Sequence, residues 1–166
     1  ILAAVPLGSG LVRPECVLAT RNGGLFSADW RGGVAHILPD GRQALYSGPG
    51  PDGLTLKPNG IALQADGSFL VTHLGAEEGG VFRLTREGRV TPWLRIVEGA
   101  DLPPTNFVLL DNAGGAWVTV STRLTPRALP KRHERTRGRQ RGRRRAGPGQ
   151  LENTSSAQAC HRGRNG

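Results

Sequence analysis

Three oxygen-bearing side chains recur at one position of a repeated motif. Glu15, Asn59 and Asn106 each precede a short apolar run, and a glycine follows each of them eight residues later. The first two are 44 residues apart and the last two are 47 residues apart. Hard cations such as Ca²⁺ prefer carboxylate and amide oxygens and take about six to eight of them, waters included. If the repeated units form a ring, these slot positions face one centre, and the sequence predicts a divalent metal site there.

Each slot residue also has a purely structural interpretation. Asn before glycine is a common turn residue, so Asn59 followed by Gly60 fits a turn as well as a metal ligand. Glu15 stands between Pro14 and an apolar run, where Glu has no turn role. No His pair or Cys cluster with zinc spacing competes. The repeated position favours a metal site with Glu15, Asn59 and Asn106 as ligands.

Two further residues could do chemistry, although each has a commoner structural use. His73 ends an expected strand and could act as a base, but a His at a strand end or on the surface is more common. Asp29 follows residues 25–28 at the corresponding place and could be a site carboxylate or a turn residue. No Ser or Thr lies in a nucleophile-elbow pattern.

Short strands must position these residues. Each of the first two units contains a slot strand, a second strand after the turn glycine, a third run that starts Gly-Gly-Val, and an outer strand after an Asp-Gly or Glu-Gly hairpin signal. In the first two units these strands are expected near residues 16–19, 25–28, 32–38 and 43–46, and near 60–63, 69–72, 79–84 and 90–93. The third unit offers 107–110 and 116–119.

Four strands per unit at a period of about 40–50 residues are typical of a β-propeller blade. A β-sandwich also has short strands and regular turns, but it would not restore one polar position at one period. No stretch shows helical periodicity. The sequence therefore predicts an all-β fold, a partial β-propeller.

The propeller is expected to be incomplete. The repeat stops near Arg123, before a third unit could supply its outer strands, which leaves about two and a half blades. A six-bladed propeller at this period needs about 240–300 residues. We therefore expect residues 1–124 to be part of a larger propeller, incomplete at both ends, and residues 125–166 to be a disordered, Arg-rich tail.

The net charge of +9 belongs to that tail. Residues 1–126 carry 10 Lys and Arg against 11 Asp and Glu, whereas residues 127–166 carry 12 against 2. Such a run is solvated, does not fold alone, and could neutralise phosphates. No Phe, Tyr or Trp follows Trp117 to stack on bases, and an out-of-frame read-through of a GC-rich gene would have the same composition. We do not expect a nucleic-acid partner.

Cysteine content and hydropathy say little about chemistry but more about location. Cys16 and Cys160 form neither a disulfide framework nor a metal site. No apolar window has transmembrane length, and residues 1–7 lack the basic region of a signal peptide. These features predict a cytoplasmic protein without a membrane partner.

The motifs resemble those of a known family. They are Pro14-Glu15 with residues 25–29, Pro58-Asn59-Gly60-Ile61-Ala62 with Asp66-Gly67, residues 79–84, and Asn106 through Asp111 to Gly115. Over about residues 10–124, their order and spacing resemble the SMP-30/gluconolactonase/LRE-like family, and most of all its bacterial lactonase branch. The resemblance implies a six-bladed β-propeller with a divalent metal, usually Ca²⁺, in its central channel, and the hydrolysis of lactones.

The resemblance also implies residue roles. Glu15 matches the first metal ligand. Asn106 matches the Asn that faces metal-bound water or substrate, so Asn106 is expected to bind both the metal and the substrate. Asn59 enters the ligand set through the internal repeat. Cys16 and Phe107 depart from the residues that usually follow these ligands. The family's later ligands, an Asn and an Asp, would fall where the tail begins, and the general base is expected among them.

The functional prediction is a fragment of a calcium-dependent lactone hydrolase that cleaves a lactone ester with metal assistance and is inactive as truncated. A small-molecule lactone is the expected partner. The alternative is a non-catalytic propeller module whose basic tail binds nucleic acid or an acidic partner.

Overall fold

The computed structural model describes residues 5–120, 122, 143–147 and 150–154. Within these residues there is no α-helix, and the one helical element is the 3₁₀ turn η1 (Pro51–Gly53). The remaining regular structure is antiparallel β-strand, so the all-β prediction is confirmed. Among the same residues, no helix has the length and apolarity needed to cross a membrane.

The strands form three four-stranded sheets, and in each sheet every strand pairs with the next one along the chain. The first sheet contains β1 (Val17–Ala19), β2 (Leu25–Asp29), β3 (Gly33–Ile37) and β4 (Gln43–Ser47). The second sheet contains β5 (Pro58–Leu63), β6 (Phe69–His73), β7 (Val81–Leu84) and β8 (Val90–Leu94). A small hairpin, β9 (Ile96–Val97) and β10 (Ala100–Asp101), leads to the third sheet of β11 (Thr105–Leu110), β12 (Ala116–Val120), β13 (Arg143–Gly147) and β14 (Gln150–Thr154).

The third sheet has two more strands than the sequence predicts. The segment 125–166 is expected to be a disordered tail, yet β13 and β14 lie within it and pair with β12 and with each other. The partial propeller therefore has three four-stranded sheets. The open edge of a strand pairs with an extended segment through backbone groups, whatever the side chains, and composition alone therefore missed these strands. The rest of the predicted tail lies outside the described residues.

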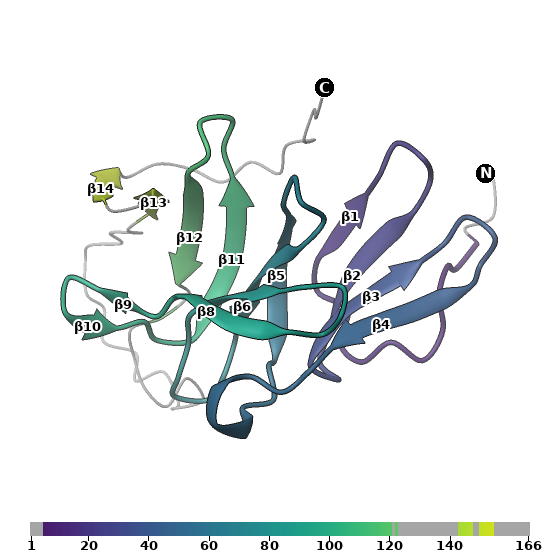
Figure 1. The fold of residues 1–166 in the computed structure, drawn as a ribbon, viewed down its shortest axis with the longest axis horizontal. Helices are drawn as coiled ribbons and strands as arrows, with labels where there is room; N and C mark the ends of the chain where they lie inside the picture. The colour runs from purple at the N-terminus through teal and green to yellow at the C-terminus, as the bar shows by residue number, and fades with distance from the viewer. Residues whose placement is uncertain (1–4, 121, 123–142, 148–149, 155–166) are drawn as a thin grey trace, which may run out of the picture.

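The three sheets stand side by side, with β5 in contact with both β1 and β11 (Figure 1). One hydrophobic cluster joins the first and second sheets, and another joins the second and third sheets. Side chains alternate along a strand, so β6 serves both clusters: Phe69 and Val71 belong to one, and Leu70 to the other. This explains why all of β6 is buried.

The recurring turn glycines have one structural cause. Gly23, Gly67 and Gly114 have φ angles of +82°, +82° and +79°. Residues with a Cβ atom rarely adopt such angles, whereas glycine does so readily. Each glycine closes a turn by donating its N–H to the carbonyl three residues earlier, at 3.0, 3.0 and 3.3 Å. The repeat in the sequence is therefore a repeat of one turn between the first two strands of each sheet.

Arg86 links the first sheet to the second. Its guanidinium lies 5.2 Å from the ring centres of Phe26 and Tyr46 in the first sheet and 5.5 Å from that of Phe69 in the second. It donates to the hydroxyl of Tyr46 at 3.2 Å and to the carbonyl of Gly67 at 3.1 Å. Because these partners belong to both sheets, Arg86 bridges the first and second sheets.

Candidate functional site

The slot positions lie at one end of the sheets, where the first strand of each sheet begins. Asn59 is the second residue of β5, Asn106 is the second residue of β11, and Glu15 stands just before β1. The pairing register shifts after Pro58 in β5 and after Thr105 in β11, so both Asn residues stand in β-bulges. A bulge re-aims the side chain of the extra residue, and the second and third slots therefore share one local structure.

Asn59 and Asn106 are in direct contact, although 47 residues separate them. Asn59 Nδ2 donates to Asn106 Oδ1 at 2.8 Å and to the Asn106 carbonyl at 3.0 Å. Thr72 Oγ1 also donates to that carbonyl, at 3.1 Å, and accepts the Gly60 N–H at 2.7 Å. Both Asn side chains are half-buried. The structure thus brings two of the three predicted ligands together and holds their amides in a fixed orientation.

The backbone approach beside this pair requires glycine. A Cβ at Gly60 would lie 2.7 Å from the Cα of Phe107 and 2.9 Å from the backbone nitrogen of Val108. Real side chains do not tolerate such distances from a backbone, so Gly60 allows β5 and β11 to come within reach of the Asn59–Asn106 contact. The Asn-Gly pair therefore acts in packing between sheets as well as in a local turn.

Glu15 is held differently from the two Asn residues. Its Oε1 accepts from Arg13 Nε at 2.7 Å, and both side chains are about 40% exposed. The Arg13 guanidinium lies 4.0 Å from the ring centre of Trp30, and Lys57 Nζ lies 5.9 Å from the same ring. Glu15 is therefore bound into a cationic and aromatic cluster before β1.

The chemistry of the slot residues fits a hard cation, although their number does not fill its shell. One carboxylate and two amide side chains supply only oxygen ligands, as Ca²⁺ prefers, but fewer than the usual six to eight or so. Within the described residues, no group of three His, Cys, Asp or Glu side chains could hold a metal ion. A complete site needs further oxygens, from water, substrate or other protein groups.

His73 is fully buried and serves the segment that leads into the second slot. Its Nδ1 accepts the backbone N–H of Lys57 at 2.9 Å, so the proton of the neutral ring lies on Nε2, which is 3.1 Å from Glu78 Oε1. Burial lowers the pKa of His73, while the Glu78 carboxylate opposes that shift. Of the interpretations drawn from the sequence, the strand-end position is correct and the surface position is wrong.

Asp29 likewise accepts a backbone N–H from the segment that leads into the first slot. This buried carboxylate accepts the backbone N–H of Val12 at 3.3 Å and is paired with Arg31, whose Nη2 lies 2.8 Å from Oδ2. Burial would raise the pKa of Asp29, but the hydrogen bonds from Arg31 and Val12 outweigh it and hold the pKa below its usual value. Asp29 and His73 are therefore best explained as groups that position the entry to a slot strand.

The third sheet lacks the hydrogen bond that joins the Lys57 N–H to His73 in the second sheet, and the sequence shows why. Pro104 and Val120 stand where Lys57 and His73 stand in the second sheet, 47 residues earlier. Proline has no N–H to donate and valine has no acceptor. The third sheet thus loses both the N–H donor and the side-chain acceptor of this hydrogen bond. Aligning the internal repeats of the sequence would have shown that the two residues change together.

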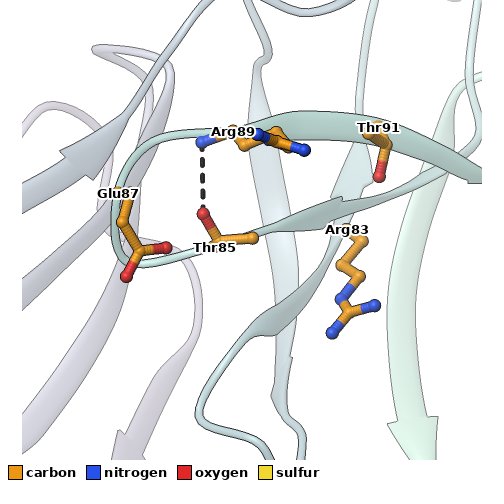
Figure 2. A pocket seen from close by; sticks show the side chains of 5 residues that line it. All are labelled: Arg83, Thr85, Glu87, Arg89 and Thr91. Atoms are coloured by element: carbon orange, nitrogen blue, oxygen red, sulfur yellow. Dashed lines mark hydrogen bonds between the residues drawn. The ribbon is translucent and has the colours of Figure 1, made fainter.

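A separate pocket of about 410 Å³ lies on the outer hairpin of the second sheet. Figure 2 shows its lining side chains on β7, β8 and the turn between them: Arg83, Thr85, Glu87, Arg89 and Thr91. The backbone N–H of Arg89 donates to Thr85 Oγ1 at 3.3 Å, and Arg83 is paired with Asp66. None of the slot residues lines this pocket.

Comparison with known proteins supports the fold. No protein-family model and no curated protein matches the chain. A gluconolactonase from Xanthomonas campestris has a TM-score of 0.57 at 16% identity over 81% of this chain and 44% of that chain. A catalytically inactive virginiamycin B lyase from Staphylococcus aureus, crystallised with quinupristin, has a TM-score of 0.54 at 16% identity over 89% and 42%. A streptogramin B lyase structure gives 0.51 at 17% identity over 83% and 39%.

These likenesses define the class of protein as a partial β-propeller, which confirms the predicted fold. Identities of 16–17% show the fold alone. The chain spans less than half the length of each of these structures. A gluconolactonase is among the similar folds, in agreement with the resemblance of the sequence motifs, and the family itself stays a prediction.

Proposed function

We propose that this chain is part of a calcium-dependent lactone hydrolase. The contact between Asn59 and Asn106 is the observation that carries the proposal, because it gathers two predicted slot ligands at matching bulges. The fold shared with a gluconolactonase supports the same activity class. Glu15, Asn59 and Asn106 would hold the metal, and Asn106 would also contact the lactone.

In that reaction the residues of this chain would bind the metal and orient the substrate. A bound divalent cation supplies polarisation of the lactone carbonyl and a more acidic water. Asn59 fixes the Asn106 amide by donating to its Oδ1, which leaves Asn106 Nδ2 as a donor for a substrate oxygen. Glu15 acts as a carboxylate ligand in competition with Arg13, and not as the general base. The proposed base belongs to blades that would follow the third.

Calcium-dependent stabilisation of the full chain tests the metal site. A ligand that binds only the folded state raises the unfolding temperature, by an amount set by its concentration relative to Kd. We expect about 10 mM Ca²⁺ to raise the unfolding temperature by a few degrees, since sites with few protein ligands bind in the millimolar range. Asn106→Ala should abolish the shift, and Arg13→Gln should increase it by removing the competing cation.

The matched control is Asn112→Ala, which changes an exposed turn Asn outside the slots. It should leave the calcium-dependent shift unchanged. If wild-type protein shows no shift, or if Asn106→Ala retains the full shift, the slot residues do not bind calcium.

A further inference from the structure

The chain contains three Asn-Gly dipeptides, and the structure places two of them in opposite environments. They are Asn22-Gly23, Asn59-Gly60 and Asn165-Gly166, the last of which lies outside the described residues. Asparagine before glycine is chemically reactive, because glycine has no side chain to keep its backbone nitrogen away from the asparagine amide. The reaction turns the asparagine into an acid, so the environment of each dipeptide decides whether its amide survives.

The reaction balances with water as its one co-reactant. The backbone nitrogen of the glycine loses its proton to a solvent base and attacks Cγ of the asparagine side chain. A C–N bond forms, the bond from Cγ to Nδ2 breaks, and Nδ2 takes up a proton and leaves as ammonia. Water then opens the cyclic imide to aspartate or isoaspartate. The glycine nitrogen must therefore be free to attack, and the asparagine side chain must be free to turn back toward it.

Asn22 meets these conditions in the turn between β1 and β2, where both Asn22 and Gly23 are exposed. The Gly23 N–H donates to the Thr20 carbonyl at 3.0 Å, a turn hydrogen bond at the surface that local opening exchanges for water. Asn22 Oδ1 faces two donors, Thr20 Oγ1 at 2.5 Å and the Gly24 N–H at 3.4 Å. Donors at this oxygen stabilise the negative charge that it gains during the attack.

Asn59 meets neither condition. Gly60 is buried in β5, and its N–H donates at 2.7 Å to the hydroxyl of Thr72, which is itself fully buried. Asn59 Nδ2 donates to the side chain and to the carbonyl of Asn106, at 2.8 and 3.0 Å. Attack by the Gly60 nitrogen would break a buried hydrogen bond, and the release of Nδ2 would break both bonds to Asn106.

The products would also have different effects at the two places. An aspartate at position 59 has no donor, so its carboxylate would face two acceptors of Asn106, the side-chain Oδ1 and the carbonyl. The contact that joins the second slot to the third would then become repulsive. At position 22 the new carboxylate would lie in an exposed turn, where water solvates it.

We propose that Asn22 is a site of spontaneous deamidation and that Thr72 protects the slot residue Asn59 from the same reaction. Thr72 is a positioning residue in this role, since its one hydroxyl holds the Gly60 nitrogen and also donates to the carbonyl of Asn106. The inference concerns the survival of an amide in the folded chain. It therefore does not rest on calcium binding or on lactone hydrolysis.

Peptide mapping by mass spectrometry tests the proposal, with the full 166-residue chain kept folded in mildly alkaline buffer. We expect acid to accumulate at Asn22 at least about tenfold faster than at Asn59, because reaction at Asn59 requires local opening. In urea-denatured protein the two rates should be similar, since both residues are then Asn before Gly in an unfolded chain. Asn112, an exposed turn residue followed by Ala113, is the internal reference for slow deamidation.

Substitutions at Thr72 test the protection itself. Thr72→Val removes the hydroxyl at nearly constant shape, and should raise the folded-state rate at Asn59 by at least about fivefold, because the Gly60 N–H loses its buried acceptor. Thr72→Ser keeps the hydroxyl and should keep the protection. His73→Leu is the matched control, since it removes a neighbouring buried acceptor but leaves the hydrogen bond between Gly60 and Thr72 in place. It should leave the Asn59 amide intact.

The outcomes separate the two parts of the proposal. Similar folded-state rates at Asn22 and Asn59, or an Asn22 that keeps its amide, would overturn the assignment of Asn22 as the reactive site. Equal rates at Asn59 in Thr72→Val and His73→Leu would overturn the role of Thr72, because general stability or strand rigidity would then explain the protection.

Discussion

At the scale of the residue, the least expected finding is that the buried polar groups hold the backbone. Asp29 and His73 each accept an N–H from the segment that enters a slot strand. A buried donor without a partner costs about 1–3 kcal/mol, so these acceptors stabilise the entry to the slot as well as shape it. Their position beside the slots would suggest catalysis from the sequence alone, but their hydrogen bonds are already used within the fold.

The first prediction concerns His73. His73→Leu removes the acceptor of the Lys57 N–H and should lower the free energy of unfolding by about 1–3 kcal/mol in urea titrations at pH 7.5. His73→Gln keeps an acceptor and should cost less. Equal losses for the two variants would mean that packing, and not the hydrogen bond, explains the role of His73.

The same residue makes stability depend on pH. Burial lowers the pKa of His73 in the folded state below its usual 6.5, so the unfolded chain takes up the proton first as pH falls. Stability is then full above that value and declines as pH drops below it, until the folded-state pKa is reached. His36, whose pKa is lowered by burial and by Arg86, adds to the slope. His73→Gln should flatten the decline without abolishing it.

At the scale of the element, sheets are joined by a few side chains that reach across. Arg86 starts on the β7–β8 hairpin and contacts rings of both the first and second sheets. His36 stacks on Phe26 at 4.2 Å and hydrogen-bonds Tyr46, so the aromatic group is itself ordered. Such a link matters because neighbouring sheets are otherwise joined mainly by non-directional apolar packing.

The second prediction concerns this link. Arg86→Met keeps an apolar stem but removes the cation and both hydrogen bonds, and should lower the free energy of unfolding by about 1 kcal/mol, a modest value because Arg86 is exposed. Arg89→Met is the control on the same hairpin and should change stability by less than about 0.5 kcal/mol. Indistinguishable urea midpoints for the two variants would show that Arg86 does not join the sheets.

At the scale of the whole molecule, the three sheets form one row whose cohesion depends on each sheet being wide enough. β13 and β14 complete the third sheet and cover the edge of β12. A two-stranded hairpin is marginally stable alone and leaves a long unpaired edge. The C-terminal segment is therefore structural where it forms strands, whatever its charge.

The third prediction is that a chain ending at residue 122 is less stable than the full chain. Removal of β13 and β14 leaves β12 with one partner, and we expect a lower unfolding temperature and concentration-dependent light scattering. A wholly disordered, dispensable tail would instead leave the unfolding temperature and the scattering unchanged. Differential scanning calorimetry of both chains, with static scattering, distinguishes these outcomes.

The sequence by itself determined the repeated unit. Strand positions, turn glycines and the slot positions follow from local signals, since backbone conformation at Gly67 or Gly114 and alternation along residues 69–73 depend on near neighbours in the chain. Repetition at 44 and 47 residues then identified the propeller, because every blade must bury its faces against equivalent neighbours.

Only the tertiary structure decided which of these positions meet. The Asn59–Asn106 contact needs the close approach of two strands at Gly60, the Arg13 pairing of Glu15 depends on local side-chain geometry, and the burial of His73 depends on sheets packed around it. Strand β13 pairs with β12 through backbone groups, and β14 pairs with β13. Side-chain composition does not predict such backbone pairing. Each of these is a long-range or geometric property, and no local pattern in one chain records it.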